Sequence, residues 1–138
     1  MKVQHVSQIE PQPVSMEGAR GCTVRWLIGQ PDGAPNFAMR QFEVAPGGHT
    51  PRHRHPYEHE VFVLAGTGAV SDGATERSLS AGDVVYVGPD EVHQFRNSGA
   101  TLLKFLCLVP LSSAGQPVTV MPECSGGACD RGPAAPRR

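Results

Sequence analysis

Four of the six histidines in the chain gather in two short stretches. His53, His55 and His59 lie close together, and His93 follows further along the chain. Neutral imidazole is the commonest protein ligand of transition metals, and rings packed together without an ion would each need another hydrogen-bond partner. The pattern therefore predicts a metal site whose ligands are His53, His55, His59 and His93. The alternative is a solvated histidine-rich loop.

Strand periodicity explains how three of these rings could converge. Residues two apart on a strand share a face, so His53 and His55 point the same way and His59 keeps that parity. Pro56 interrupts the backbone ladder between the pair and the third ring, which allows a bend toward one point. Glu60 is the alternative to His59, but it lies on the opposite face of the strand. Parity therefore favours His59 as the ligand.

The other two histidines are not expected to take part. His5 lies near the N-terminus, and His49 precedes the cluster in a glycine-rich turn. We expect both to be solvated.

The elements that must hold the site are predicted to be strands. The 16 Gly and 13 Pro punctuate the chain, and no long window keeps an apolar stripe at helical spacing. Short runs rich in Val, Phe, Leu and Tyr lie between these turn residues. The predicted strands are 22–28, 37–44, 59–64, 68–71, 75–79, 84–87, 94–97 and 101–109. Eight strands of this length suit a closed all-β barrel of two sheets.

The chain divides into three parts by composition. Residues 1–30 form an N-terminal arm with the first strand, which we expect to take part in a dimer interface, and residues 31–113 form the barrel. Residues 114–138 are rich in Ser, Ala, Gly and Pro and read as a tail. Cys124 and Cys129 in this tail could form a disulfide or a metal clip, or remain two reduced thiols, since their spacing is not that of common zinc knuckles.

Composition excludes several classes of partner. Twelve basic and 13 acidic residues leave a formal charge of −1, so the chain has no excess positive charge that would attract nucleic acid or an anionic membrane. The apolar runs are too short to span a bilayer. No apolar stretch behind Lys2 marks the chain for secretion, and we expect a cytoplasmic protein.

The spacing of the two histidine stretches resembles the two motifs of the cupin superfamily. Gly47, His53, His55 and Gly66 occupy the places of the first motif, and Gly82, His93 and Asn97 occupy those of the second. His59 stands where the first motif has a glutamate. Gly88 and Asp90 depart from the second motif, whose proline comes one position late, at Pro89. The resemblance implies the double-stranded β-helix, or jelly-roll barrel, of cupins.

The histidine in place of glutamate makes the chain similar to small single-domain bacterial cupins with four histidine ligands, which bind manganese. The likeness extends to residues 25–29, 34–40, 55–60 and 105–110. It implies a manganese ion, although four imidazoles also suit Fe, Cu, Ni, Co or Zn. A zinc ion bound by all four histidines would have no open coordination position, and its role would be purely structural.

Parity also predicts the wall of a pocket around the ligands. In 101–109 the inward residues are Leu103, Phe105, Cys107 and Val109, and in 37–44 Arg40 shares a face with the apolar Ala38, Phe42 and Val44. Ordinary core packing is the alternative for Phe105 and Cys107. An unpaired buried guanidinium is costly, so Arg40 would need an anionic ligand to balance it. We take Arg40, Phe105 and Cys107 as candidate pocket residues.

These residues lead to a functional hypothesis and its alternatives. A six-coordinate ion with four protein ligands keeps two positions for substrate and dioxygen. Together with the resemblance, this favours an oxygen-dependent, dioxygenase-like oxidoreductase acting on a small enolic, phenolic or unsaturated substrate. The alternatives are a small-molecule sensor without turnover, and a lyase or isomerase that uses the ion as a Lewis acid. We also expect a homodimer, because Phe62 and Leu64 point outward and small cupins pair by exchanging an N-terminal strand.

Overall fold

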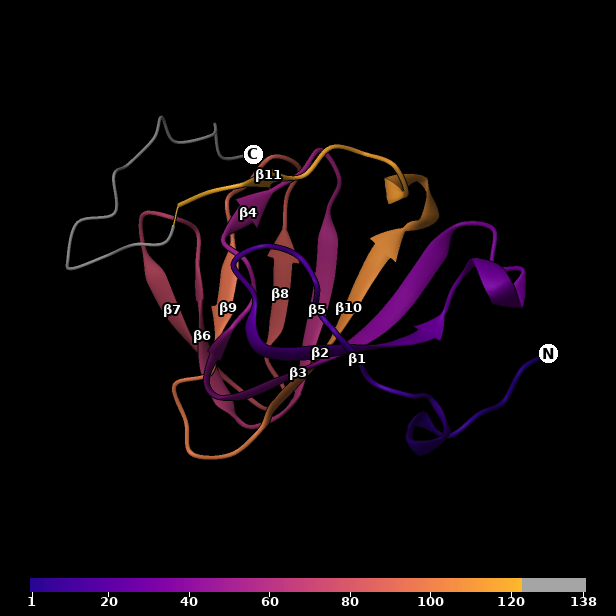
Figure 1. Ribbon diagram of the computed structural model, residues 1–138, viewed down its shortest axis with the longest axis horizontal. Helices are drawn as coiled ribbons and strands as arrows, with labels where there is room; N and C mark the ends of the chain where they lie inside the picture. Colours follow the sequence, from indigo (N-terminus) through magenta and orange to yellow (C-terminus); the bar gives the residue numbers. More distant parts are fainter. Residues whose placement is uncertain (123–138) are drawn as a thin grey trace.

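The structure, a computed structural model, describes residues 1–122, which fold almost entirely into β-strands (Figure 1). The strands are β1 (Gln12–Pro13), β2 (Arg20–Ile28), β3 (Phe37–His49), β4 (His53–Arg54), β5 (His59–Ala65), β6 (Thr67–Ser71), β7 (Glu76–Ser80), β8 (Val84–Val87), β9 (Gln94–Arg96), β10 (Leu103–Pro110) and β11 (Thr119–Val120). Three short 3-10 helices accompany them: η1 (Val6–Gln8), η2 (Gln30–Asp32) and η3 (Leu111–Ser113). All eight predicted strands are present, with shifted ends, and β1, β4 and β11 are additional. In this part of the chain, no helix is long and apolar enough to cross a membrane.

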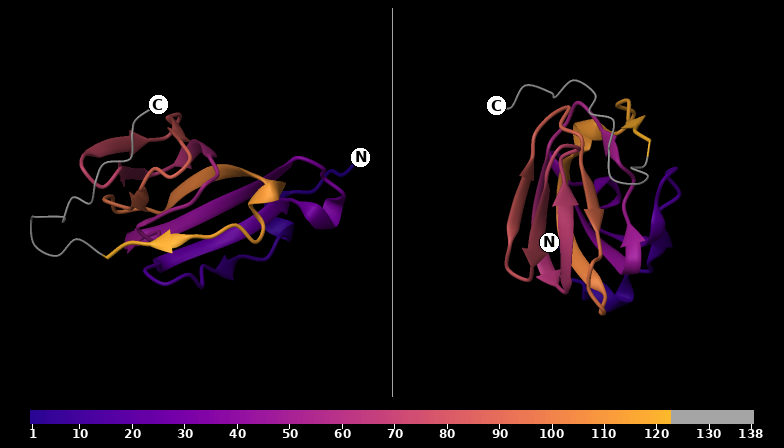
Figure 2. Two further views of the ribbon diagram at one scale, coloured as in Figure 1. Left: turned by 90° about the horizontal axis from the view of Figure 1, so that it is seen from above. Right: turned by 90° about the vertical axis from the view of Figure 1, so that its left-hand side faces the viewer.

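Nine of the strands form one antiparallel sheet that curls on itself. The hydrogen-bonded order is β7-β6-β9-β3-β10-β5-β8, with β2 added on β3 and β1 on β2. Figure 2 shows the resulting layers, with β2 and β3 on one side and β6 and β7 on the other. The remaining two strands, β11 and β4, pair with each other. The predicted all-β architecture is therefore confirmed.

The sheet differs from the predicted closed barrel in one respect. Within residues 1–122 no ladder joins β7 to β8, so the sheet is an open half-barrel. On β7 only Leu79 is buried, and the other four side chains, which are all charged or hydroxylated, are exposed. Charged side chains are typical of edge strands that do not pair further.

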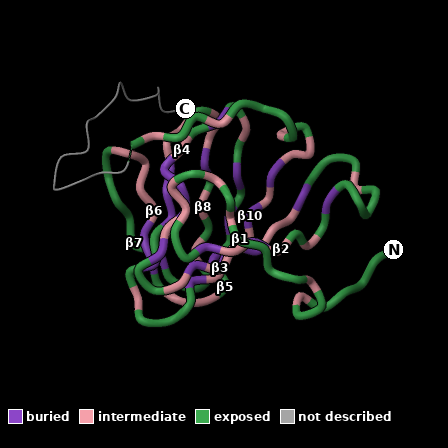
Figure 3. Tube along the Cα trace, in the orientation of Figure 1, coloured by how far each residue is buried: buried purple, intermediate pink, exposed green. Residues whose placement is uncertain are grey.

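The core lies inside the curl and follows the predicted alternation (Figure 3). On β10 the buried residues are Leu103, Phe105, Cys107 and Val109, and the residues between them are half-buried. On β5, His59, Val61 and Val63 point inward, whereas Glu60, Phe62 and Leu64 are largely exposed. The predicted facing of both strands is confirmed.

A glycine allows a close backbone contact at the turn between β5 and β6. Gly66, between β5 and β6, has a φ of +84°, and a Cβ on it would lie 2.5 Å from the carbonyl oxygen of Leu102. Only glycine meets both demands without strain. The tight turn carries the chain directly from β5 into β6.

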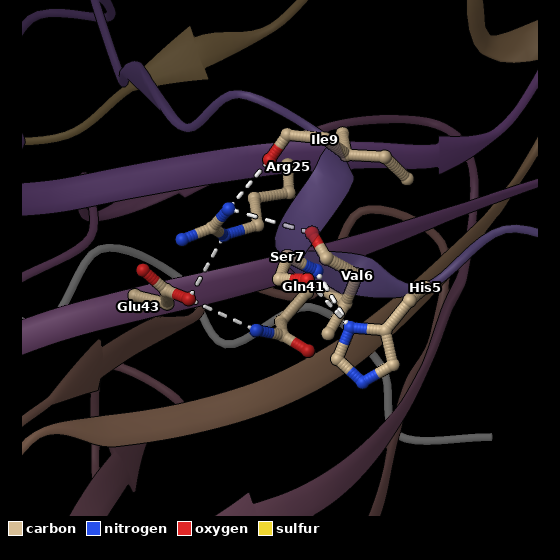
Figure 4. Close-up of polar contacts among 7 residues, drawn as sticks. All are labelled: His5, Val6, Ser7, Ile9, Arg25, Gln41 and Glu43. Atoms are coloured by element: carbon tan, nitrogen blue, oxygen red, sulfur yellow. Dashed lines mark hydrogen bonds and ion pairs between the residues drawn. The ribbon is translucent and has the colours of Figure 1, made fainter.

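The N-terminal segment is attached to the outer face of β2 and β3 (Figure 4). The Arg25 guanidinium donates hydrogen bonds to the carbonyl oxygens of Val6 and Ile9 and pairs with Glu43, at 3.1 Å between Nε and Oε1. Gln41 donates to the same carboxylate at 3.0 Å. This network positions residues 5–9 before the chain reaches β1.

Candidate metal centre

The four predicted ligands come from three neighbouring places in the fold. His53 begins β4, His55 lies in the loop after it, His59 begins β5, and His93 immediately precedes β9. His53 and His93 form an antiparallel bridge, in which the His93 amide donates to the His53 carbonyl at 2.9 Å and the reverse bond measures 3.2 Å. The loop is held by the Asp90 amide, which donates to the His55 carbonyl at 2.7 Å. Backbone pairing thus brings together histidines that are distant in the sequence.

The imidazoles converge on one point. One ring nitrogen from each of the four histidines lies within 4.8 Å of the corresponding nitrogens of the others. Ring centroids are 4.3 Å apart for His53 and His93, and 4.5 Å apart for His55 and His59. His55, His59 and His93 are 2 to 6% exposed. Glu60 is exposed on the opposite side of β5 and does not reach the cluster.

Backbone carbonyls orient three of the rings. The Nδ1 atoms of His53, His55 and His93 lie 2.7, 2.7 and 2.8 Å from the carbonyl oxygens of Pro51, Tyr57 and Glu91. A carbonyl can only accept, so each Nδ1 carries the proton and each Nε2 presents a lone pair. A hydrogen bond from the other ring nitrogen to a carbonyl commonly fixes the tautomer of metal-binding histidines. The arrangement therefore suits ligation through Nε2.

The donor set fits a divalent ion. The Nε2 atoms of His55 and His59 are 2.8 Å apart, while His93 Nε2 and His59 Nδ1 are buried without a hydrogen-bond partner. Unpaired buried nitrogens are costly unless something else accepts their lone pairs. Four neutral imidazoles satisfy several first-row divalent ions without a strong preference among them.

Burial keeps the cluster in the form that binds metals. Desolvation lowers the pKa of His53, His59 and His93, and it lowers the pKa of His55 to about 4. The positive charge of Arg40 lowers all four pKa values further. Neutral imidazoles are therefore available at physiological pH.

These shifts predict how the metal-free protein responds to acid. An imidazole in the unfolded chain takes up a proton near its ordinary pKa of about 6.5, whereas the buried ring does not. The free energy of unfolding should therefore decrease as the pH falls from about 6.5 toward 4, as urea titrations of the metal-free protein can measure. His55→Gln should flatten this dependence, and His5→Gln, at an exposed site, should preserve it. Equal profiles for the two variants would contradict the assignment.

A cavity of ≈ 280 Å³ adjoins the cluster. Its lining includes all four histidines and the predicted pocket residues Arg40, Phe105 and Cys107. Residues 12–16, Trp26 and Tyr57 also line it. The sequence pattern predicted neither residues 12–16 nor Trp26 in this lining, because it does not indicate that the N-terminal arm reaches the cavity.

Arg40 occupies an unusual environment in this cavity. Its Nη2 donates to Cys107 Sγ at 3.2 Å, and its guanidinium lies 4.9 Å from the ring centroid of Phe42 and 5.4 Å from that of Trp26. Its Nε is buried without a partner. Burial raises the pKa of the Cys107 thiol, although Arg40 opposes this effect, so the sulfur is a weak, neutral acceptor.

The chain after η3 returns to support the strand that carries His53. Val120 pairs with His53 and Thr119 with Arg54, and the Met121 amide donates to the Arg52 carbonyl at 2.7 Å. The buried Arg52 side chain donates to the Pro122 carbonyl at 2.8 Å. Residues 119–122, which belong to the predicted tail, therefore form one flank of the two-residue strand β4.

Removing this flank should weaken metal binding. A chain that ends at Gln116 lacks β11, so we expect it to bind Mn²⁺ at least about tenfold more weakly than the full chain. Losing groups that orient metal ligands commonly weakens metal binding by this much. A chain that ends at Pro122 keeps every contact described above and should retain the full affinity. Calorimetric titration of both chains tests this, and equal affinities would contradict it.

The other two histidines, His5 and His49, lie outside the cluster. His5 is exposed and its Nδ1 accepts from the Ser7 amide at the start of η1. The expectation of a solvated His49 is wrong: the ring is half-buried, 3.2 Å from the Thr50 carbonyl and 3.3 Å from Gln94 Nε2, because β3 continues through it to pair with β9. Cys124 and Cys129 lie outside the described residues.

The sequence and the fold agree with one known family. The cupin domain family (Cupin_2) matches residues 40–109, about half of the chain, and this segment contains all four histidines. The chain therefore belongs to the cupin family.

Several known proteins are similar to this chain. An oxalate-binding protein of Thermotoga maritima is 29% identical over 109 residues, which cover 76% of this chain and 90% of that protein. The 1-methylthio-D-xylulose 5-phosphate methylsulfurylase of Rhodospirillum rubrum is 38% identical over 71 residues, and the match spans 51% of this chain but only 46% of that enzyme. The structure of the polyketide cyclase RemF from Streptomyces resistomycificus superimposes with a TM-score of 0.82 and 31% identity, over 90% of this chain and 87% of that one.

Proposed function

We propose that the protein holds one divalent ion through His53, His55, His59 and His93 and acts on a small enolic or phenolic molecule in an oxygen-dependent oxidation. The observation that carries this proposal is the convergence of four neutral imidazoles at one end of a cavity. A redox-active ion bound there would supply the electron transfer that couples substrate and dioxygen. We propose Mn²⁺ as the ion, with Fe, Cu, Ni, Co and Zn as alternatives.

The residues of the chain prepare the cavity for such a ligand. Phe105 stacks on both Phe42 and Phe95, and the three rings form an apolar wall. An apolar wall lowers the local dielectric constant and so strengthens electrostatic interactions beside it. Tyr57 stacks on His55 at 3.8 Å between ring centroids and fixes that ring in place. Apolar walls with few polar groups are typical of small-molecule sites.

A second candidate function is a reaction in which the ion serves only as a Lewis acid. The similarity to the polyketide cyclase RemF over most of both chains favours this candidate. The similarity to an oxalate-binding protein favours a third one, binding without turnover. The same ligand set is compatible with all three, because fold and ligands do not determine the reaction.

Oxygen consumption separates these candidates. The metal-loaded protein is incubated with a panel of enolic and phenolic compounds, while an oxygen electrode and mass spectrometry follow dioxygen and product. Consumption of dioxygen with a matching oxidised product supports the proposal. Product formation that persists without oxygen supports the Lewis-acid reaction, and saturable binding without product supports a sensor.

We further propose that two copies of the chain form a homodimer through an apolar face. On β5 and β8, Phe62, Leu64, Val84 and Tyr86 are 40 to 74% exposed, and Phe62 lies directly opposite Val84. Monomeric proteins rarely leave such a contiguous apolar patch in water. Light scattering at micromolar concentration should give the mass of two chains, and Phe62→Glu with Val84→Glu should give one. A wild-type mass of one chain would reject the dimer. The expected cytoplasmic location remains a prediction for cell fractionation to test.

A further inference from the structure

The cavity beside the histidines is short of negative charge. Its lining, taken from residues 1–122, contains no Asp or Glu, and Arg40 is its one cationic residue besides the imidazoles. Histidine binds a metal as the neutral imidazole, so metal-bound rings add no negative charge. A bound divalent ion would therefore add to the charge of Arg40 rather than offset it. Like charges in one protein cavity repel each other unless an anion lies between them.

Arg40 is held in place without a counter-ion. The rings of Trp26 and Phe42 lie on its guanidinium at cation–π distances, and Cys107 Sγ accepts a bond from Nη2. No carboxylate within residues 1–122 pairs with it, and its Nε is buried without a partner. A guanidinium has five N–H donors, and a neutral thiol is a weak acceptor. The side chain is thus preorganised for an acceptor that this part of the chain does not supply.

We infer that Arg40 binds an anionic oxygen group of the ligand, and that the cavity selects small ligands with two anionic oxygen groups, such as dicarboxylates and carboxylates next to an enolate. This inference rests on the proposed metal site and narrows its substrate class. One anionic oxygen group would face the ion, and the other would face the guanidinium, whose planar fork matches a carboxylate. A volume of ≈ 280 Å³ limits the ligand to a small molecule.

Three compounds of nearly the same shape test the charge preference. Oxalate is a dianion, oxamate replaces one carboxylate by an amide, and oxamide is neutral. Their affinities for the Mn²⁺-loaded protein are measured by calorimetry without oxygen, so that no turnover is needed. We expect oxalate to bind most tightly and oxamide most weakly. Arg40→Gln should weaken oxalate binding about 10- to 100-fold, as expected for a lost charge-assisted hydrogen bond, and should leave oxamide nearly unchanged.

Two further variants separate recognition from structure. Arg40→Lys keeps the charge but loses the fork, so oxalate should bind with intermediate affinity. Arg96→Gln removes an arginine that pairs with Glu76 outside the cavity, and it should leave all three affinities unchanged. Metal content and thermal unfolding are measured for each variant. Equal affinities for the three compounds, equal losses for all of them in Arg40→Gln, or a loss of metal in that variant would overturn the inference.

The proposed metal site can fail separately. If the protein retains no metal, the proposed function is wrong, and the three compounds are then titrated into the metal-free protein and followed by NMR. An oxalate preference that disappears in Arg40→Gln would still support Arg40 as an anion-binding residue, and its absence would overturn that role as well.

Discussion

The His59→Ala variant should bind Mn²⁺ at least about 100-fold more weakly than the wild type. Removing a residue that only hydrogen-bonds to a metal ligand already lowers metal affinity by about 10- to 100-fold, and His59 is proposed as a ligand itself. His59 is buried in the cluster, and its Nε2 lies 2.8 Å from that of His55. Three imidazoles would remain, with a cavity in place of the fourth. Calorimetric titration of the metal-free variant with Mn²⁺ measures the loss directly.

Glu60→Ala is the matched control for this prediction. Glu60 is the next residue on β5, and its side chain is exposed on the opposite face. This variant should keep the wild-type affinity. The opposite result, in which Glu60→Ala loses metal and His59→Ala keeps it, would show that the carboxylate is the ligand. Circular dichroism of both variants checks that the fold is intact.

Phe105→Ala should lower the free energy of unfolding by about 3–5 kcal/mol, the usual cost of truncating a fully buried aromatic residue. Phe105 is 1% exposed and stacks between Phe95 and Phe42, with ring centroids 4.7 and 5.4 Å away. Truncation removes this contact area and leaves a hole in the wall of the cavity. Urea unfolding of the metal-free protein measures the change without a contribution from metal binding.

Phe37→Ala provides the comparison at an exposed position. Phe37 begins β3 and is 66% exposed, so the same substitution there should change stability by about 0.5 kcal/mol or less. A loss in Phe105→Ala as small as the one expected for Phe37→Ala would mean that Phe105 is not a core residue of the folded protein in solution.

Period-two alternation carried most of the information about the fold. Because one face of each long strand is buried, the inward positions of β5 and β10 could be predicted residue by residue. They include Cys107 on β10, which pairs with Arg40 on the neighbouring strand β3. The same parity distinguished His59 from Glu60. Local pattern and packing agree at these positions, which is why sequence reasoning succeeds there.

Other features depend on contacts between distant segments, and no local pattern indicates them. The two-residue strands β1, β4 and β11 are too short to show alternation, and the pairing of β11 with β4 joins residues far apart in the chain. Tyr57 and Trp26 enter the cavity wall through a loop and through the curl of the sheet. The prediction for His49 failed because its glycine-rich surroundings read as a turn, whereas they continue β3.

The most direct test of the metal centre is a crystal structure of the Mn²⁺-loaded protein with anomalous diffraction data from manganese. We expect one anomalous peak per chain, about 2.0–2.3 Å from one ring nitrogen each of His53, His55, His59 and His93. A map without a peak among these four rings, or with its peak on other residues, would contradict it.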